Sequence, residues 1–179
     1  MKAILAIVLF ATLGSVAAQG KMSTKTGKIT FEASVPSFEE IKARNDAATC
    51  VLNTATGEIA SLAMIRGFRF KIALMEEHFN ENYLESDKYP KATFRGKIEN
   101  FKLSDVTDDP KNYNLRGKLE LHGNTREINA PAKIRRTAGG IEIITDFVVN
   151  TNDYEIGIPA VVRNKISKNV TIHGEFLVK

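Results

Sequence analysis

The sequence predicts an all-β protein of antiparallel strands with one short amphipathic helix near residues 71–83. Much of the 179-residue chain consists of short segments in which apolar and polar side chains alternate. A period of two with one polar side is typical of half-buried antiparallel strands. Turn-forming pairs separate these segments at spacings too short for crossover helices, and they are Asp109-Pro110, Gly123-Asn124 and Gly139-Gly140.

The first 18 residues have the pattern of a secretory signal peptide. They begin with the basic pair Met1-Lys2, continue as an apolar run over residues 3–16, and end in the small residues Ala17-Ala18. The apolar run is too short to remain as a membrane anchor. We therefore expect cleavage after Ala18, a single mature domain of residues 19–179, and a periplasmic or secreted protein without stable membrane insertion.

Charge and cysteine content narrow the function classes. The formal net charge is +4, and the basic residues alternate with acidic ones instead of forming a block, so nothing indicates nucleic-acid binding. Cys50 is the only cysteine, which excludes a disulfide within the chain. We interpret it as a small buried apolar residue; a cross-link between two chains is the alternative.

The predicted strands follow one another along the chain, and each has one apolar side. We expect these apolar side chains to share the inner face of the sheet. They are Ile29, Phe31 and Ala33; Phe94, Gly96 and Ile98; Leu115, Gly117, Leu119 and Leu121; Ile128, Ala130, Ala132 and Ile134; Ile141, Ile143, Phe147 and Val149; and Val170, Ile172, Gly174, Phe176 and Val178.

Two predicted strands are apolar on both sides. Residues 58–70 carry apolar side chains at odd and even positions, and residues 141–149 add Ile144 and Val148 on the second side. An apolar outer face needs a cover. We therefore expect a helix or a second subunit to lie against these strands.

One helix interrupts the strands. Met75, Phe79 and Tyr83 recur at four-residue spacing, with Glu77 and Glu81 on the opposite side. This pattern predicts an amphipathic helix of about three turns with its apolar side on the barrel or sheet.

About eight to ten strands in one domain either stack as a sandwich or close as a barrel, and the local pattern does not choose between them. Small residues on the expected inner face favour a barrel with internal space, above all Gly96, Gly117 and Ala130. A barrel of about eight strands is just wide enough to hold one small ligand. The alternative is that the strand glycines mark bends or bulges.

No residue pattern indicates an enzyme. The chain has no Gly-x-Ser-x-Gly motif, no phosphate-binding glycine loop and no paired cysteines. Its three histidines, His78, His122 and His173, lack metal-ligand spacing, and we expect them to be solvated or capping residues. The sequence therefore predicts no catalytic residue, no metal site and no cofactor.

Four segments resemble the YceI-like lipid/polyisoprenoid-binding family. They read LMEEHFNENYLE at residues 74–85, KYPKATFRG at 88–96, LELHGNT at 119–125 and DYEIGIP at 153–159. The resemblance implies an extended, lipocalin-like antiparallel β-barrel around a long isoprenoid or fatty chain. It also implies a periplasmic or secreted location, often a homodimer, and no catalytic residues. The stretch Val35-Pro36-Ser37-Phe38 departs from the family's plainer end of the first strand.

Strand parity and the resemblance together nominate ten residues for a hydrophobic ligand pocket. Burial of an alkyl chain gains about 0.8 kcal/mol per methylene, so an apolar wall suffices to bind a long lipid of several kinds. We therefore expect a protein that carries or sequesters such a lipid; the alternative is a structural or interaction barrel with a filled core. The nominated residues are Phe31, Met75, Phe79, Phe94, Ile98, Leu119, Ile134, Phe147, Ile172 and Phe176.

Overall fold

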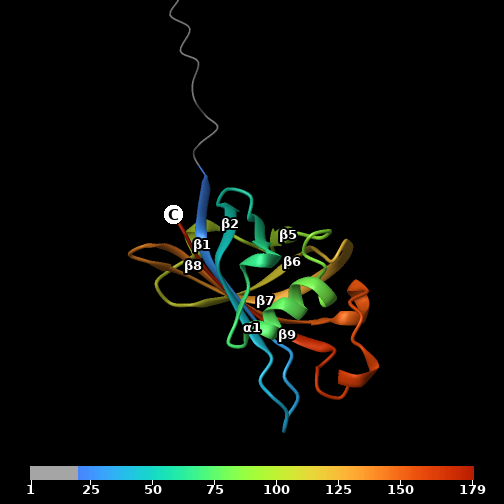
Figure 1. The fold of residues 1–179 in the computed structure, drawn as a ribbon. Coiled ribbons are helices and arrows are strands. Elements are labelled where there is room, and N and C mark those ends of the chain that lie inside the picture. Colours follow the sequence, from blue (N-terminus) through green and yellow to red (C-terminus); the bar gives the residue numbers. More distant parts are fainter. Residues whose placement is uncertain (1–19) are drawn as a thin grey trace, which may run out of the picture.

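The computed structural model describes residues 20–179, which form one antiparallel sheet of nine strands closed into a barrel (Figure 1). The predicted cleavage site after Ala18 lies outside these residues. The strands are β1 (Lys21–Glu32), β2 (Lys42–Asn53), β3 (Glu58–Met64), β4 (Arg69–Phe70), β5 (Lys91–Ile98), β6 (Lys111–Leu121), β7 (Asn124–Thr137), β8 (Gly140–Asn150) and β9 (Asn169–Val178).

The sheet order is β1-β9-β8-β7-β6-β5-β3-β2-β4, and β1 also pairs with β2. Eight strands therefore close a ring, and the two-residue β4 is attached to β2. The prediction of an extended, lipocalin-like antiparallel barrel with one short helix is confirmed. A closed ring leaves no long edge strand unpaired.

A bulge in β1 lets the barrel close. The register between β1 and β2 shifts on both sides of Gly27, and beyond it β1 pairs with β2 and β9 at once. The ring of Phe176 lies over Gly27 so closely that a Cβ there would fall 2.4 Å from its Cδ1 atom. Glycine is the residue that such a bend with close packing requires.

The apolar segment at residues 58–70 is not one strand, which corrects the sequence interpretation. β3 ends at Met64, a 3-10 turn η1 (Ile65–Gly67) follows, and β4 resumes at Arg69. Odd-numbered residues face inward before the turn and even-numbered residues after it, so Ile65 and Phe68 are both buried in the core. On β8, Val148 is 60% exposed, so no other part of residues 20–179 covers the strand at that position.

The helix lies where it was predicted. It comprises α1 (Ala73–His78) and one π-helical turn η2 (Phe79–Tyr83), and it covers one end of the barrel (Figure 1). Glu76 fixes its start, because its carboxylate accepts hydrogen bonds from Arg69 Nη1 at 2.7 Å and from the Phe70 amide at 3.1 Å. Within the described residues, no helix has the length and apolar character to cross a membrane.

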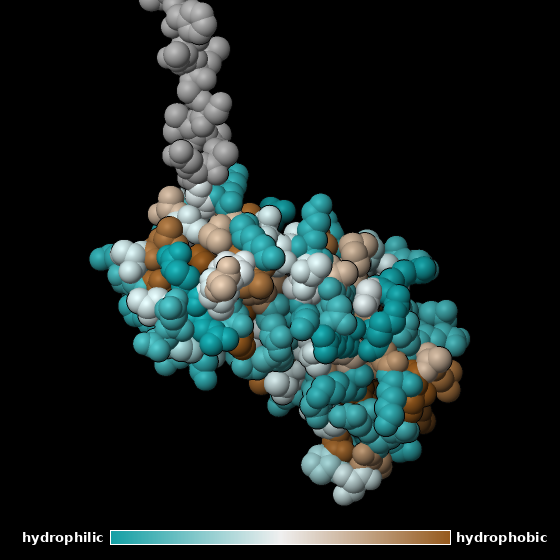
Figure 2. Space-filling view, turned by 90° about the vertical axis from the view of Figure 1, so that its left-hand side faces the viewer, coloured by the Kyte–Doolittle hydropathy of each residue, from teal (hydrophilic) through white to brown (hydrophobic). Residues whose placement is uncertain are grey.

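Three more short 3-10 turns lie between strands: η3 (Leu103–Asp105), η4 (Thr151–Tyr154) and η5 (Ala160–Val162). The outer surface is mainly polar. Figure 2 shows a face covered mostly by hydrophilic residues, with apolar ones at its upper left and lower right. The core, by contrast, runs through the inside of the barrel. It includes buried residues from seven strands, and partly buried residues of β1 and β4 pack against them.

Candidate functional site

The barrel encloses a cavity of about 500 Å³. Strands β1, β2, β3, β5, β6, β7, β8 and β9 all contribute side chains to its wall, as do the helix and the segment after η4. Eight of the ten phenylalanines line it, and the remaining wall is mostly aliphatic. A concave, largely apolar and preformed space of this size is typical of a small-molecule binding site.

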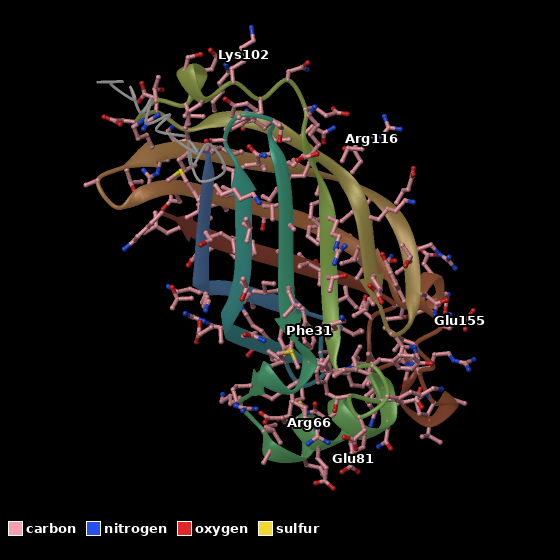
Figure 3. The ribbon with its side chains drawn as sticks, turned by 90° about the horizontal axis from the view of Figure 1, so that it is seen from above. Phe31, Arg66, Glu81, Lys102, Arg116 and Glu155 are labelled. Carbon is pink, nitrogen blue, oxygen red and sulfur yellow. The ribbon has the colours of Figure 1, made fainter. Side chains whose placement is uncertain are left out.

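The cavity occupies only part of the barrel, and the other part is solid. Leu52, Ile98, Ile134, Ile141 and Val178 are fully or almost fully buried, yet none of them lines the cavity. They fill the end of the barrel away from the helix, where the β5–β6 connection bearing Lys102 passes (Figure 3). The cavity is therefore closed at this end.

Eight of the ten nominated pocket residues line the cavity. The other two, Ile98 and Ile134, each 0% exposed, belong to the solid end. Those that line the cavity are Phe31, Met75, Phe79, Phe94, Leu119, Phe147, Ile172 and Phe176.

Gly96 and Gly117 have a different place from the one expected. They lie directly opposite each other on β5 and β6, and neither lines the cavity. A Cβ on Gly96 would fall 2.4 Å from the carbonyl oxygen of Arg116, and one on Gly117 would fall 2.4 Å from that of Arg95. The pair thus permits a close approach of two backbones. The two glycines therefore serve the geometry of the strands, the alternative to providing internal space. Ala130, 1% exposed, does line the cavity.

Four phenylalanines form an aromatic cluster where the helix meets the barrel. Phe31 stacks on Phe79 with ring centroids 5.2 Å apart, and Phe68 and Phe70 contact both at centroid distances of 5.2–5.8 Å. Figure 3 shows Phe31 beside the helix end of the barrel, with Glu81 on the far side of the helix. Sequence reasoning missed Phe68 and Phe70 as wall residues because it placed both in one straight strand.

The single cysteine of the wall is not activated as a nucleophile. Cys50 is fully buried and lines the cavity, and burial raises the pKa of its thiol to about 12. The nucleophilic thiolate is therefore not populated near neutral pH. The Thr145 hydroxyl also lies in the wall, but it is engaged as a donor to the Pro131 carbonyl oxygen at 2.8 Å. Within residues 20–179, no three His, Cys, Asp or Glu side chains are grouped to hold a metal ion.

The charged residues of the lining, Glu39 and Lys165, mark together with His78 where the cavity meets solvent. All three are exposed. Glu39 lies on the β1–β2 connection together with Phe38, His78 ends α1, and Lys165 follows η5. These three segments therefore form the mouth of the cavity, at the same end as the aromatic cluster.

His122 is buried, contrary to the expectation of a solvated side chain. The hairpin turn between β6 and β7 is formed by His122 and Gly123, with φ of 49° and 74°, one residue earlier than predicted. Two positive φ values are the signature of a type I′ turn. The His122 ring bonds the Tyr154 carbonyl oxygen at 3.0 Å and Glu85 Oε2 at 2.8 Å. It thereby joins the end of the helical segment to the barrel wall.

Comparison with known proteins agrees with this architecture. A family model described as the YceI-like domain matches residues 8–177. The chain belongs to the YceI-like family. A search of curated proteins finds no significant match.

Three solved structures place the barrel among other YceI-like folds. A polyisoprenoid binding domain from Saccharophagus degradans has 16% identity and a TM-score of 0.76, covering 89% of this chain and 98% of that one. Burkholderia cenocepacia BcnA has 15% identity and a TM-score of 0.69, covering 86% and 96%. A Campylobacter jejuni YCEI protein has 15% identity and a TM-score of 0.61, covering 98% and 99%. At 15–16% sequence identity, these similarities show a shared fold and do not extend to ligands or partners.

Proposed function

We propose that this YceI-like protein binds one long apolar lipid, an isoprenoid or a fatty chain, in the barrel and carries or sequesters it unchanged. The observation that carries the proposal is the apolar cavity of about 500 Å³, closed at one end and open at a mouth that bears the only charged lining residues. This arrangement suits a molecule with a long apolar tail and a small polar head. The polyisoprenoid binding described for the Saccharophagus degradans domain supports the same ligand class.

The energetics of such binding depend on tail length. Each buried methylene contributes about 0.8 kcal/mol, so a tail of several prenyl units binds without directed polar contacts. The same wall discriminates weakly between tails, because one methylene more or less changes the free energy by only about 1–3 kcal/mol. We therefore propose a ligand class defined by chain length and apolar character, which includes quinones, polyprenols and fatty amides.

The open space argues against the alternative of a filled structural barrel. A protein interior packs densely with few voids larger than a water molecule, so a filled module would not leave about 500 Å³ unoccupied. Burial holds the Cys50 thiol of the wall protonated, so it is not available as a nucleophile, and this supports a binding protein over an enzyme.

Extraction of the purified protein tests the proposal. Organic solvent followed by mass spectrometry should recover close to one equivalent of a long-chain lipid per chain. A Phe79→Asp variant, which places a carboxylate in the wall, should recover little, and Glu81→Ala on the exposed side of the helix should match the unchanged protein. Recovery of no lipid from protein that is folded and was expressed in lipid-containing cells would contradict the proposal.

We also propose that residues 1–18 are removed on export, so that the protein acts in the periplasm or outside the cell. The basic start, the apolar run and the small residues before Gln19 support this. Intact-mass measurement of protein from a periplasmic or culture fraction should give a chain that begins at Gln19. Homodimer formation, implied by the family resemblance, is tested by light scattering on the same preparation.

A further inference from the structure

A single loop beside the cavity mouth presents both exposed apolar and basic side chains. This η5 loop, residues 157–168, connects η4 to β9 and contains the 3-10 turn η5. Its inner side belongs to the cavity, because Ile158, Val162 and Ile166 line the wall. Its outer side carries Val161, which is 82% exposed and is the most exposed large apolar residue within residues 20–179.

Val161 is held outward by the backbone of the loop. The Val162 amide donates to the Pro159 carbonyl oxygen at 3.1 Å, and the Lys165 amide donates to that of Val162 at 2.8 Å. Further along, the Ser167 amide bonds the Ala33 carbonyl oxygen at 2.9 Å and ties the loop to the end of β1. Val162 therefore faces the cavity while its neighbour Val161 faces solvent, directly beside the mouth.

The charge of the η5 loop has one sign. Arg163, Lys165 and Lys168 are all exposed, and residues 157–168 contain no aspartate or glutamate. The β1–β2 connection differs in charge, because Glu39 and Glu40 follow the exposed Phe38 there. An exposed apolar side chain flanked by cations is the pattern of a segment that rests on an anionic lipid surface.

We propose that the η5 loop docks on an anionic phospholipid bilayer, so that the cavity mouth meets the membrane when a lipid enters or leaves. The proposal rests on the proposed function, because a lipid cargo resides in a bilayer before loading and after release. Charge complementarity selects the η5 rim over the acidic β1–β2 rim. Each Lys or Arg held near an anionic surface strengthens binding by about fivefold, and salt screens this contribution.

Vesicle co-sedimentation tests the docking surface. The purified protein is mixed with vesicles of phosphatidylcholine alone or of phosphatidylcholine and phosphatidylglycerol in equal parts. We expect binding to the anionic vesicles only, and its loss at about 1 M salt, where the Debye length falls to about 3 Å. Val161→Asp, and the double variant Arg163→Glu with Lys168→Glu, should each weaken binding by about tenfold or more.

Two matched controls use the outer face of the barrel strands instead of the loop. Val148→Asp changes another exposed valine, 60% exposed on β8. The double variant Lys97→Glu with Arg116→Glu makes the same change in net charge at adjacent exposed positions of β5 and β6. Both controls should bind anionic vesicles almost as well as the unchanged protein. Equal losses in controls and loop variants would overturn the assignment of the η5 loop.

Lipid occupancy separates this inference from the proposed function. Every variant is extracted and its lipid quantified alongside the sedimentation. We expect Val161→Asp to retain its lipid while it loses vesicle binding. If the protein holds lipid but binds neither kind of vesicle, the proposed docking on a membrane is wrong. The partner of the loop would then be a protein, and the proposed lipid binding would stand. A protein that holds no lipid contradicts the proposed function whatever the vesicles show.

Discussion

Gly96 and Gly117 show how a single missing side chain shapes the barrel. They pair across β5 and β6, and a side chain on either would fill space that the opposite backbone occupies. Glycine weakens a strand interior because it adds no packing and costs conformational entropy. In return for this cost, the two glycines let β5 and β6 approach closely. A residue with a Cβ at either position would force the two backbones to shift.

Gly117→Ala should lower the free energy of unfolding by about 1–3 kcal/mol, because the added Cβ would overpack against the Arg95 carbonyl. Gly157→Ala is the matched control, since a Cβ there meets nothing within 4 Å. Urea unfolding of both variants provides the measurement. Equal stability of the two variants would show that β5 and β6 separate at little cost.

His173 gives the barrel a pH-dependent contribution to stability. Its Nδ1 atom bonds Asp146 Oδ1 at 2.6 Å and its Nε2 atom bonds Glu175 Oε1 at 3.0 Å, across the outer face of β8 and β9. The hydrogen bond to Asp146 is the main reason that the pKa of His173 is raised above its ordinary value of 6.5. The protonated ring is thus favoured in the folded state.

The sign of this effect follows from linkage. Stabilisation by a raised pKa is fully present below the unfolded value of 6.5 and is lost as pH rises through the higher folded value. The stability difference between the unchanged protein and His173→Gln should therefore be larger at pH 5.5 than at pH 8.5. Denaturant unfolding at both pH values measures it, and a difference that grows toward pH 8.5 would contradict the assignment. Asp146→Asn should give the same trend.

Among the elements, the helical segment α1–η2 has the clearest division of faces. Phe79 is buried in the aromatic cluster with Phe31, Phe68 and Phe70, whereas Glu77 and Glu81 are exposed. The helix has only six α-helical residues. Isolated helices of this length are not stable, so its stability comes from packing against the barrel.

Phe79→Asp should therefore cost about 3–5 kcal/mol of unfolding free energy, because it removes aromatic packing and places a carboxylate among apolar groups. Glu81→Ala should change stability by less than about 0.5 kcal/mol. Thermal or denaturant unfolding of the two purified variants makes the comparison. Similar behaviour of both would mean that the two faces of the helix contribute equally.

Element boundaries explain which features could be predicted. Alternation placed Phe31, Phe94 and Phe176 on the inner face because a continuous strand preserves parity. It failed at Phe68 and Phe70, because the 3-10 turn at residues 65–67 changes parity and no local signal marks it. The Gly96–Gly117 contact depends on how two strands cross, which is a tertiary property that neither segment encodes alone.

The hairpin at His122 illustrates a smaller error of the same kind. Gly123-Asn124 is an acceptable turn pair, yet the structure uses His122-Gly123 and begins β7 at Asn124. A shift of one residue reverses the side to which a strand residue points. It also brings His122 into contact with Glu85 and the Tyr154 carbonyl, two groups distant in sequence.

At the scale of the whole molecule, the barrel combines a solid end with a hollow end. The solid end is built from large buried aliphatic residues, among them Ile98, Ile134 and Ile141. The hollow end is closed by the helix and open between the β1–β2 connection and the η5 loop. Stability can thus reside mainly in one half while the other half keeps space for a ligand. The position of the boundary between them should set the length of tail that fits.

Ala130 lies at this boundary, because it lines the cavity while Ala132 and Ile134 on the same strand do not. Ala130→Leu adds three carbon atoms at the closed end and should shorten the cavity. The longest tails would then lose about 2 kcal/mol of binding free energy, a preference of about thirtyfold for shorter chains. Mass spectrometry of extracted lipids measures the shift. Ala92→Leu makes the same change on β5 near the helix, where it narrows the cavity without shortening it. Equal chain-length profiles for the two variants would show that the tail does not reach Ala130.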